Sequence, residues 1–87
     1  MRYSKASDWV EINGAADLPM RDLDALYTAT TEKAFSIAKG VVVDWGVTVK
    51  GAAVEVGDMM GLPLRLWDWL RDCILKSARD EALDPEA

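Results

Sequence analysis

Apolar residues recur at spacings of three and four along residues 18–45, and this period is typical of an amphipathic helix. The start of the helix has local signals, because Asp17 can cap it and Pro19 fits a first turn, where a missing N–H costs little. At the other end, the β-branched run in Val41–Trp45 favours a strand, but its position allows the helix to continue. We predict one helix over about 18–45. Its apolar stripe comprises Met20, Leu23, Tyr27, Thr30, Ala34, Ile37 and Val41.

A second helix is predicted over about 63–83, after the breakers Gly61 and Pro63. Its apolar side chains fall on two adjoining stripes: Leu66, Leu70, Cys73 and Ser77 with Trp69 at the edge, and Trp67, Ile74 and Ala78. A helix that contacts one neighbour buries a stripe about 100° wide, and this apolar arc is wider. Two explanations stay open: the helix packs on both the first helix and a hairpin, or part of the arc contacts another subunit or a partner protein.

The segment 47–56 has two β-branched arms around a glycine and predicts a small β-hairpin. A ribbon of two strands is only marginally stable alone, so a short N-terminal strand at Trp9–Ile12 is expected to join it. The predicted fold class is α+β, mainly α, with two principal helices and a small hairpin. We expect a single domain over residues 1–87, with flexible ends at 1–8 and 84–87.

Length and charge narrow the possible partners. A core built from 87 residues gives modest stability, which favours a homo-oligomer. The net charge of −5 and the dispersed lysines and arginines disfavour binding to nucleic acid or to an anionic membrane. No uncharged stretch reaches the roughly 18 residues of a membrane-spanning helix, so the expected location is the cytoplasm.

Candidate chemistry is sparse. The chain has no histidine, which removes the commonest general base and metal ligand, and its glycines form no phosphate-binding motif. The carboxylate pairs Asp22/Asp24 and Asp68/Asp72 are explained by the helix dipole and by basic neighbours. The single Cys73 lies among apolar residues and is interpreted as a core thiol. We therefore expect a protein without catalytic, metal or cofactor sites.

The order of several landmarks resembles a known family. These landmarks are Asp8-Trp9-Val10-Glu11, a helix opening at Leu18-Pro19, Val42-Val43-Asp44-Trp45, a hairpin centred on Gly51, and Leu62-Pro63 followed by Leu66 and Trp69-Leu70. This layout resembles the small tail assembly chaperones of long-tailed phages and prophages, particularly those of actinobacterial hosts. The resemblance spans roughly Trp9 to Leu75.

The resemblance implies a non-catalytic protein of the host cell cytoplasm. Such a chaperone binds the tape measure protein, or another phage tail protein, and keeps it soluble while the tail tube assembles. Carried over by position, the partner or subunit contacts would be Trp45, Leu66, Trp67, Trp69, Leu70 and Ile74. A longer form made by ribosomal frameshifting is known in such families, and a protein sequence does not reveal one.

Two other functions fit the same composition. A structural tail or neck component would use the apolar face to build a permanent ring and would be present in purified particles. A small acidic cytoplasmic regulator, similar to an antitoxin, would form a tight complex with one basic partner.

Overall fold

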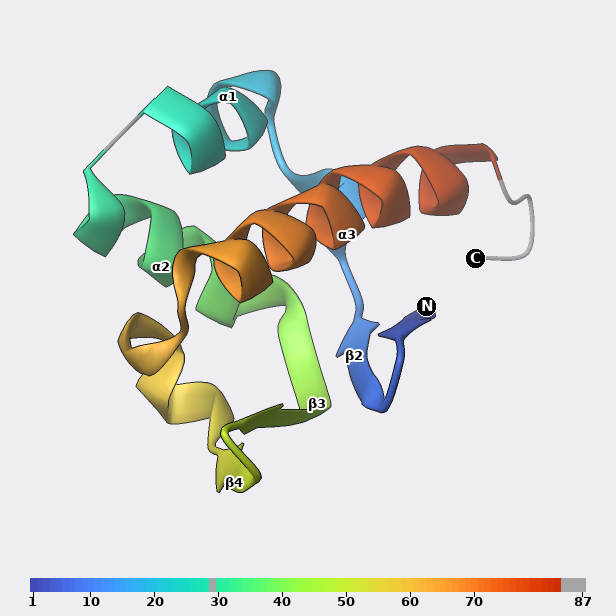
Figure 1. Cartoon of the computed structure of the whole chain (residues 1–87). Helices are drawn as coiled ribbons and strands as arrows, with labels where there is room; N and C mark the ends of the chain where they lie inside the picture. Colours follow the sequence, from blue (N-terminus) through green and yellow to red (C-terminus); the bar gives the residue numbers. More distant parts are fainter. Residues whose placement is uncertain (29, 84–87) are drawn as a thin grey trace.

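The computed structural model describes residues 1–28 and 30–83, and their helices and strands are shown in Figure 1. The strands and helices follow in this order: β1 (Arg2–Lys5), β2 (Asp8–Ile12), the 3-10 helix η1 (Ala15–Asp17), α1 (Met20–Thr28), α2 (Thr31–Val41), β3 (Val42–Val49), β4 (Ala52–Val54), the 3-10 helix η2 (Val56–Gly61) and α3 (Leu64–Leu83). Helices and strands occur in one mixed fold with more helix than strand, which confirms the predicted α+β class.

The four strands form an antiparallel sheet in the order β1-β2-β3-β4. β3 pairs with β2 along its first half and with β4 along its second half. The register between β2 and β3 shifts at Glu11/Ile12, where Val42 is paired with Ile12 and Asp44 with Glu11. Val43 is therefore left unpaired at a bulge, and it is 62% exposed.

The single helix predicted over 18–45 is wrong in two places. The first is a break after α1, where Thr30 has an extended backbone and its hydroxyl accepts a hydrogen bond from the Lys33 N–H at 3.4 Å. This cap begins a new helix, α2. The second is the segment 42–45, because α2 ends at Val41 and the chain continues as β3. Pairing with β2 satisfies the backbone of this β-branched run, and no pattern within the run itself shows that partner.

The other predicted elements are confirmed. α3 begins one residue after the predicted start, and the expected hairpin and N-terminal strand are present as β3–β4 and β2. The hairpin turn is Lys50-Gly51, and both residues have positive φ (53° and 81°), as a two-residue type I′ turn requires. Of the ends expected to be flexible, residues 2–5 form the edge strand β1, and residues 84–87 lie outside the described part of the chain.

Gly46 accommodates an aromatic ring on the outer face of the sheet. It is paired with Trp9, and a Cβ atom at Gly46 would overlap the Trp9 indole. The Arg2 guanidinium lies over the Trp9 ring, 4.3 Å from its centre. The sheet therefore holds Trp9 between a cation and a bare stretch of backbone.

Gly46→Ala should lower the free energy of unfolding by about 1–3 kcal/mol, because the new methyl group displaces the Trp9 ring. Gly40→Ala is the matched control: nothing lies within 4 Å of its Cβ position in α2, so alanine should stabilise by about 0.5–1 kcal/mol. Urea unfolding measures both changes. In a Trp9→Ala background the cost of Gly46→Ala should disappear, and an unchanged cost there would show that the indole is not its cause.

The core forms where α3 crosses the centre of the molecule, between α1 and α2 on one side and the strands on the other (Figure 1). α3 contacts α1, α2, η1 and β2. Its buried apolar residues are Leu66, Trp67, Leu70, Cys73, Ile74 and Ala78. One helix with several neighbours buries a wider arc than a helix with one, which accounts for the apolar width of α3.

Candidate binding groove

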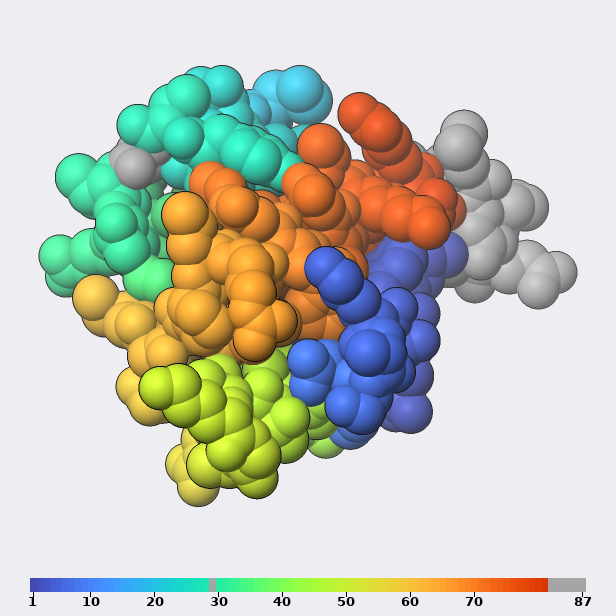
Figure 2. Space-filling model, viewed as in Figure 1, coloured from blue at the N-terminus to red at the C-terminus, as the bar shows by residue number. Residues whose placement is uncertain are grey.

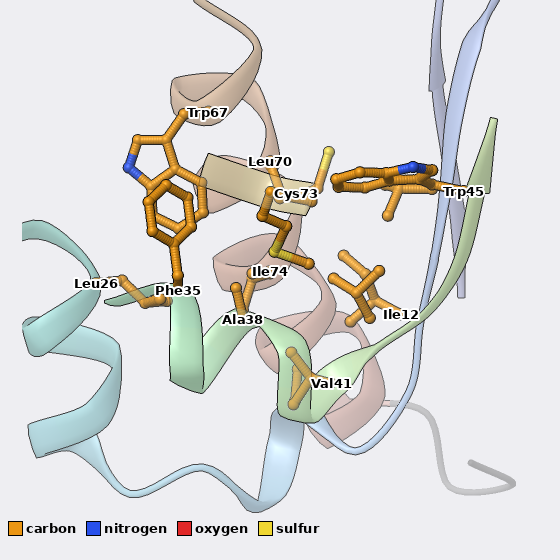
Figure 3. Close-up of a cluster of buried hydrophobic side chains, with 14 of the residues drawn as sticks. Ile12, Leu26, Phe35, Ala38, Val41, Trp45, Trp67, Leu70, Cys73 and Ile74 are labelled. Atoms are coloured by element: carbon orange, nitrogen blue, oxygen red, sulfur yellow. The ribbon is translucent and has the colours of Figure 1, made fainter. Parts of the chain in front are cut away.

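The residues that the resemblance marks as contacts lie mainly inside the molecule. Trp45, Leu66, Trp67, Leu70 and Ile74 are all buried, and Trp69 is partly buried. Five of them belong to one hydrophobic cluster, much of which is drawn in Figure 3. The apolar arc of α3 is thus occupied by the chain's own side chains. Packing within the chain was the first of the two explanations left open by the sequence, but the main neighbours of α3 are α1, α2, η1 and β2 and not the hairpin.

Trp67 has close neighbours within the chain. Its ring centre lies 4.5 Å from that of Phe35, with the two ring planes tilted by 50°. Figure 3 shows these two rings together, with Leu26 beside them. Trp69 lies two positions further along the helix and so points away from Trp67. It lines a separate depression with Tyr3 and Lys76.

Exposed apolar side chains gather elsewhere, at the corner where η2 leads into α3. Leu64 is 70% exposed, Met60 is 64% exposed, and Tyr27 at the end of α1 is 44% exposed. All three line one groove with a volume of about 440 Å³. In Figure 2 the gold residues near 60–65 lie on the same side of the molecule as the teal residues of α1 and α2. This groove is the candidate functional site.

The walls of the groove come from four helical segments. α1 contributes Leu26 and Tyr27, and α2 contributes Thr31, Ala34 and Phe35. The facing wall consists of Met60 in η2, Leu62 in the connection, and Leu64, Trp67 and Arg71 in α3. The buried faces of Phe35 and Trp67 thus lie deep in the groove, and the exposed Met60 and Leu64 lie at its rim.

Arg71 is the one charged residue among the described groove residues, and its charge is already occupied. Its guanidinium is paired with the Asp68 carboxylate and donates to the Leu26 carbonyl at 3.4 Å. It also lies 4.7 Å from the centre of the Tyr27 ring and 5.7 Å from that of Trp67. Arg71 therefore joins α3 to α1 through ring stacking and hydrogen bonds.

Two carboxylates of α3 contact groove residues but do not line the groove. Leu64, Asp68 and Asp72 follow one another at intervals of four residues, so they lie on the same face of α3. The Tyr27 hydroxyl donates to the Asp72 carboxylate at 2.9 Å. Burial, followed by this hydrogen bond, raises the pKa of Tyr27 above its usual value of 10, so its hydroxyl stays protonated at neutral pH.

Other acidic residues of α3 hold the fold together. The Tyr3 hydroxyl donates to Asp80 at 3.0 Å, and the Ala16 N–H donates to Glu81 at 3.1 Å. Burial and the bond to Asp80 raise the pKa of Tyr3 to about 12. Glu81 also accepts a hydrogen bond from the fully buried Ser77 hydroxyl. These carboxylates connect α3 to β1 and η1, which explains their presence without catalysis.

Cys73 is buried in the core, and burial, followed by the charge of Asp72, raises the pKa of its thiol to about 11. The thiol is therefore protonated at neutral pH and is a poor nucleophile.

Stability should fall as the pH rises from about 9 to about 11. Over this window the Cys73 thiol of the unfolded chain loses its proton, while the folded chain retains it, so the unfolded state is favoured. Below pH 9 the contribution that the Cys73 thiol makes to the stability of the folded state is fully present. Urea unfolding across this range should show a shallower decline for Cys73→Ala than for the wild type. Equal slopes would contradict the raised pKa.

Two general features complete the description of residues 1–28 and 30–83. No helix there combines the length and apolar character needed to cross a membrane. In the same part of the chain, no three acidic or cysteine side chains come together as a metal ion would require.

The groove was missed by sequence reasoning because its rim residues belong to different elements. Met59-Met60 does suggest an adaptable surface, but methionine is more often a core residue. The structure divides the pair, since Met59 is fully buried and Met60 is exposed. Comparisons with protein-family models, curated proteins and solved structures find no match for this chain.

Proposed function

We propose that this protein is a non-catalytic tail assembly chaperone of a phage or prophage. It binds the tape measure protein in the host cell cytoplasm and keeps it soluble while the tail tube assembles around it. The observation that carries the proposal is the open apolar groove with Met60 and Leu64 exposed at its rim. A small acidic domain with such a groove is suited to covering apolar stretches of another protein.

The proposed contact surface differs from the one implied by the resemblance. The tryptophans at 45 and 67 stabilise the domain, and the rim residues Met60, Leu64 and Tyr27 contact the partner. Each groove is small, so a long partner would be covered by many copies, whose weak contacts add up along its length.

The DNA on either side of the gene tests this function first. We expect a very long coding region for a helical protein downstream, and a slippery heptamer with an overlapping shifted frame before the stop codon. A small toxin-like gene and no tail genes would overturn the proposal and favour an acidic regulator.

The composition of purified phage particles separates a chaperone from a structural component. A chaperone departs before the particle is complete, so mass spectrometry of particles should not detect this chain. Its presence at a fixed ratio to other tail proteins would support a tail or neck ring and contradict the proposal.

A further inference from the structure

We infer that the free edge of β1 binds an extended, acidic segment of another protein, which adds a fifth strand to the sheet and lies in a depression between β1 and α3. This depression shares no lining residue with the groove between α1–α2 and the η2–α3 corner. The inference therefore goes beyond the proposed function and does not depend on it.

The outer edge of β1 presents backbone groups that β2 does not bind. β1 is the first strand in the order β1-β2-β3-β4, so only one of its edges is paired. Met1 and Ile12 exchange two backbone hydrogen bonds, and bonded pairs alternate with non-bonded pairs along an antiparallel ladder, so Tyr3 is the next residue bonded to β2. The N–H and C=O groups of Arg2 and Ser4 therefore point away from β2, where an added strand would bind them.

A depression of about 410 Å³ runs along this edge. One wall consists of Arg2, Tyr3 and Ser4, whose side chains alternate between the two faces of the sheet. A depression that meets all three lies beside the strand, on the side away from β2. The other wall is a stretch of α3, and Figure 2 shows the blue N-terminal residues against the orange residues of this helix. The α3 residues that line it are Trp69, Asp72, Cys73 and Lys76.

This combination of a strand edge and a neighbouring helix suits an extended segment. The backbone of the segment would bond to Arg2 and Ser4, and alternate side chains would enter the depression and contact Trp69. Trp69 is partly buried, so it offers apolar contact area that the chain itself leaves uncovered. A bound helix would satisfy its own backbone and leave the edge of β1 unpaired.

Charge favours carboxylates on the added segment. Arg2 and Lys5 are the charged residues of β1, and Lys76 lies on the α3 wall. Within residues 1–28 and 30–83 the ion pairs are those of the amino terminus and Arg71, so the three cations have no carboxylate partner there. The carboxylates beside them on β2 and α3 already have donors: Asp8, Glu11, Asp72 and Asp80. A partner carboxylate would thus find unpaired cations, whereas a partner lysine would find carboxylates that are already engaged.

A second copy of this chain is a poor occupant of the edge. β1 has the sequence Arg-Tyr-Ser-Lys, with two cations and no acid. Two such strands paired with each other would gather four cations on one short ribbon, and charged residues on edge strands oppose pairing of this kind. An acidic strand meets no such repulsion.

The test titrates the full chain with designed peptides of about eight residues, slightly longer than a typical strand. One peptide alternates valine or threonine with glutamate, and a matched peptide has lysine in place of glutamate. Two further glutamate peptides carry N-methyl groups on alternate residues, either on the edge that faces β1 or on the opposite edge. Only the first of these loses its backbone donors to β1, so it should not bind, while the second should bind normally.

Hydrogen exchange at Ser4 reports strand addition directly. At a glutamate-peptide concentration ten times the Kd, about nine-tenths of the chains are bound, so the Ser4 amide should exchange roughly tenfold more slowly. In a ¹⁵N–¹H spectrum the Trp69 indole N–H signal should move. The signals of the buried Trp45 and Trp67 should stay in place.

The glutamate peptide should bind roughly tenfold more tightly than the lysine peptide in low salt. This ratio should shrink near 1 M salt, where the screening length is about 3 Å. Lys76→Gln, which removes the cation of the α3 wall, should lower the preference severalfold.

Ser4→Pro removes the outward N–H of β1 and should weaken binding of the glutamate peptide at least tenfold. Proline is tolerated on an edge strand where its N–H would face solvent, so the thermal midpoint should stay close to that of the wild type. Ala53→Pro is the matched control on the other edge strand. Ala53 lies between two residues of β4 that pair with β3, so its N–H also faces outward, and this variant should bind as the wild type does.

The inference is overturned if the two charged peptides bind equally, if exchange at Ser4 is unchanged, or if both N-methyl peptides bind alike. The N-methyl pair decides the question even if Ser4→Pro fails to fold. Slower exchange at Ser4 that depends on protein concentration, with no peptide present, would identify a second copy as the occupant and overturn the inference too.

Discussion

Trp67→Ala should lower the free energy of unfolding by about 3–5 kcal/mol. The side chain is 8% exposed, packs against the tilted Phe35 ring and lies beneath the Arg71 guanidinium. Its removal leaves a cavity between α2 and α3, and the surrounding helices relax only in part. If Trp67 were an interface residue, as the sequence suggested, Trp67→Ala would instead leave folding nearly intact.

Urea unfolding of Trp67→Ala beside Leu64→Ala measures this effect. Both residues line the groove, but Leu64 is 70% exposed, so its replacement should change stability by less than about 0.5 kcal/mol. A Trp67→Ala variant as stable as Leu64→Ala would show that this ring is not part of the core. The buried position of Trp67 on α3 would then be wrong.

Trp45→Ala should have an effect of similar size, again about 3–5 kcal/mol. Trp45 is buried in the same cluster as Leu70 and Cys73 (Figure 3). Its indole N–H also donates to the Val54 carbonyl at 2.7 Å, which fastens β4 to the core. The variant should lose both the packing and the attachment of the hairpin.

Trp45→Phe separates these two contributions. Phenylalanine keeps most of the apolar contact but leaves the Val54 carbonyl without its donor, at a cost of about 1 kcal/mol. Val43→Ala on the same strand is the control and should be nearly neutral, because Val43 is mostly exposed. If Trp45→Phe were as damaging as Trp45→Ala, then the hydrogen bond and not packing volume would dominate at this position.

Elements with strong local signals were predictable from the sequence. Pro63 and the three-to-four spacing beyond it define α3, and Lys50-Gly51 defines the hairpin turn. The strand at the start of β3 was not predictable, because its pairing partner lies some 30 residues earlier in β2. The break before α2 depends on a single cap at Thr30, whose signal is weak beside the continuing apolar period.

The site was harder to predict than the fold. The width of the apolar arc on α3 was a correct observation, but its explanation is the number of neighbours that α3 contacts within the chain. The groove arises only when η2 brings Met60 beside α1 and α2, and no periodicity along one element reports such a juxtaposition. The candidate contacts chosen from the sequence were mainly large aromatic and apolar residues of the core, whereas the exposed apolar residues of the groove are Met60, Leu64 and Tyr27.

The double variant Met60→Glu/Leu64→Glu is a suitable probe of function because it should fold. Both positions are exposed, and a glutamate at the first residue of α3 interacts favourably with the helix dipole. Its thermal midpoint should remain close to that of the wild type.

The most direct measurement of the proposed role is the soluble fraction of the tape measure protein in cells that express it alone, with the wild-type chain, or with the double variant. We predict a soluble tape measure protein with the wild type only, and an insoluble one in the other two cases. A tape measure protein that stays insoluble with the wild type would contradict the chaperone function, and one kept soluble equally by the double variant would contradict the role of the groove.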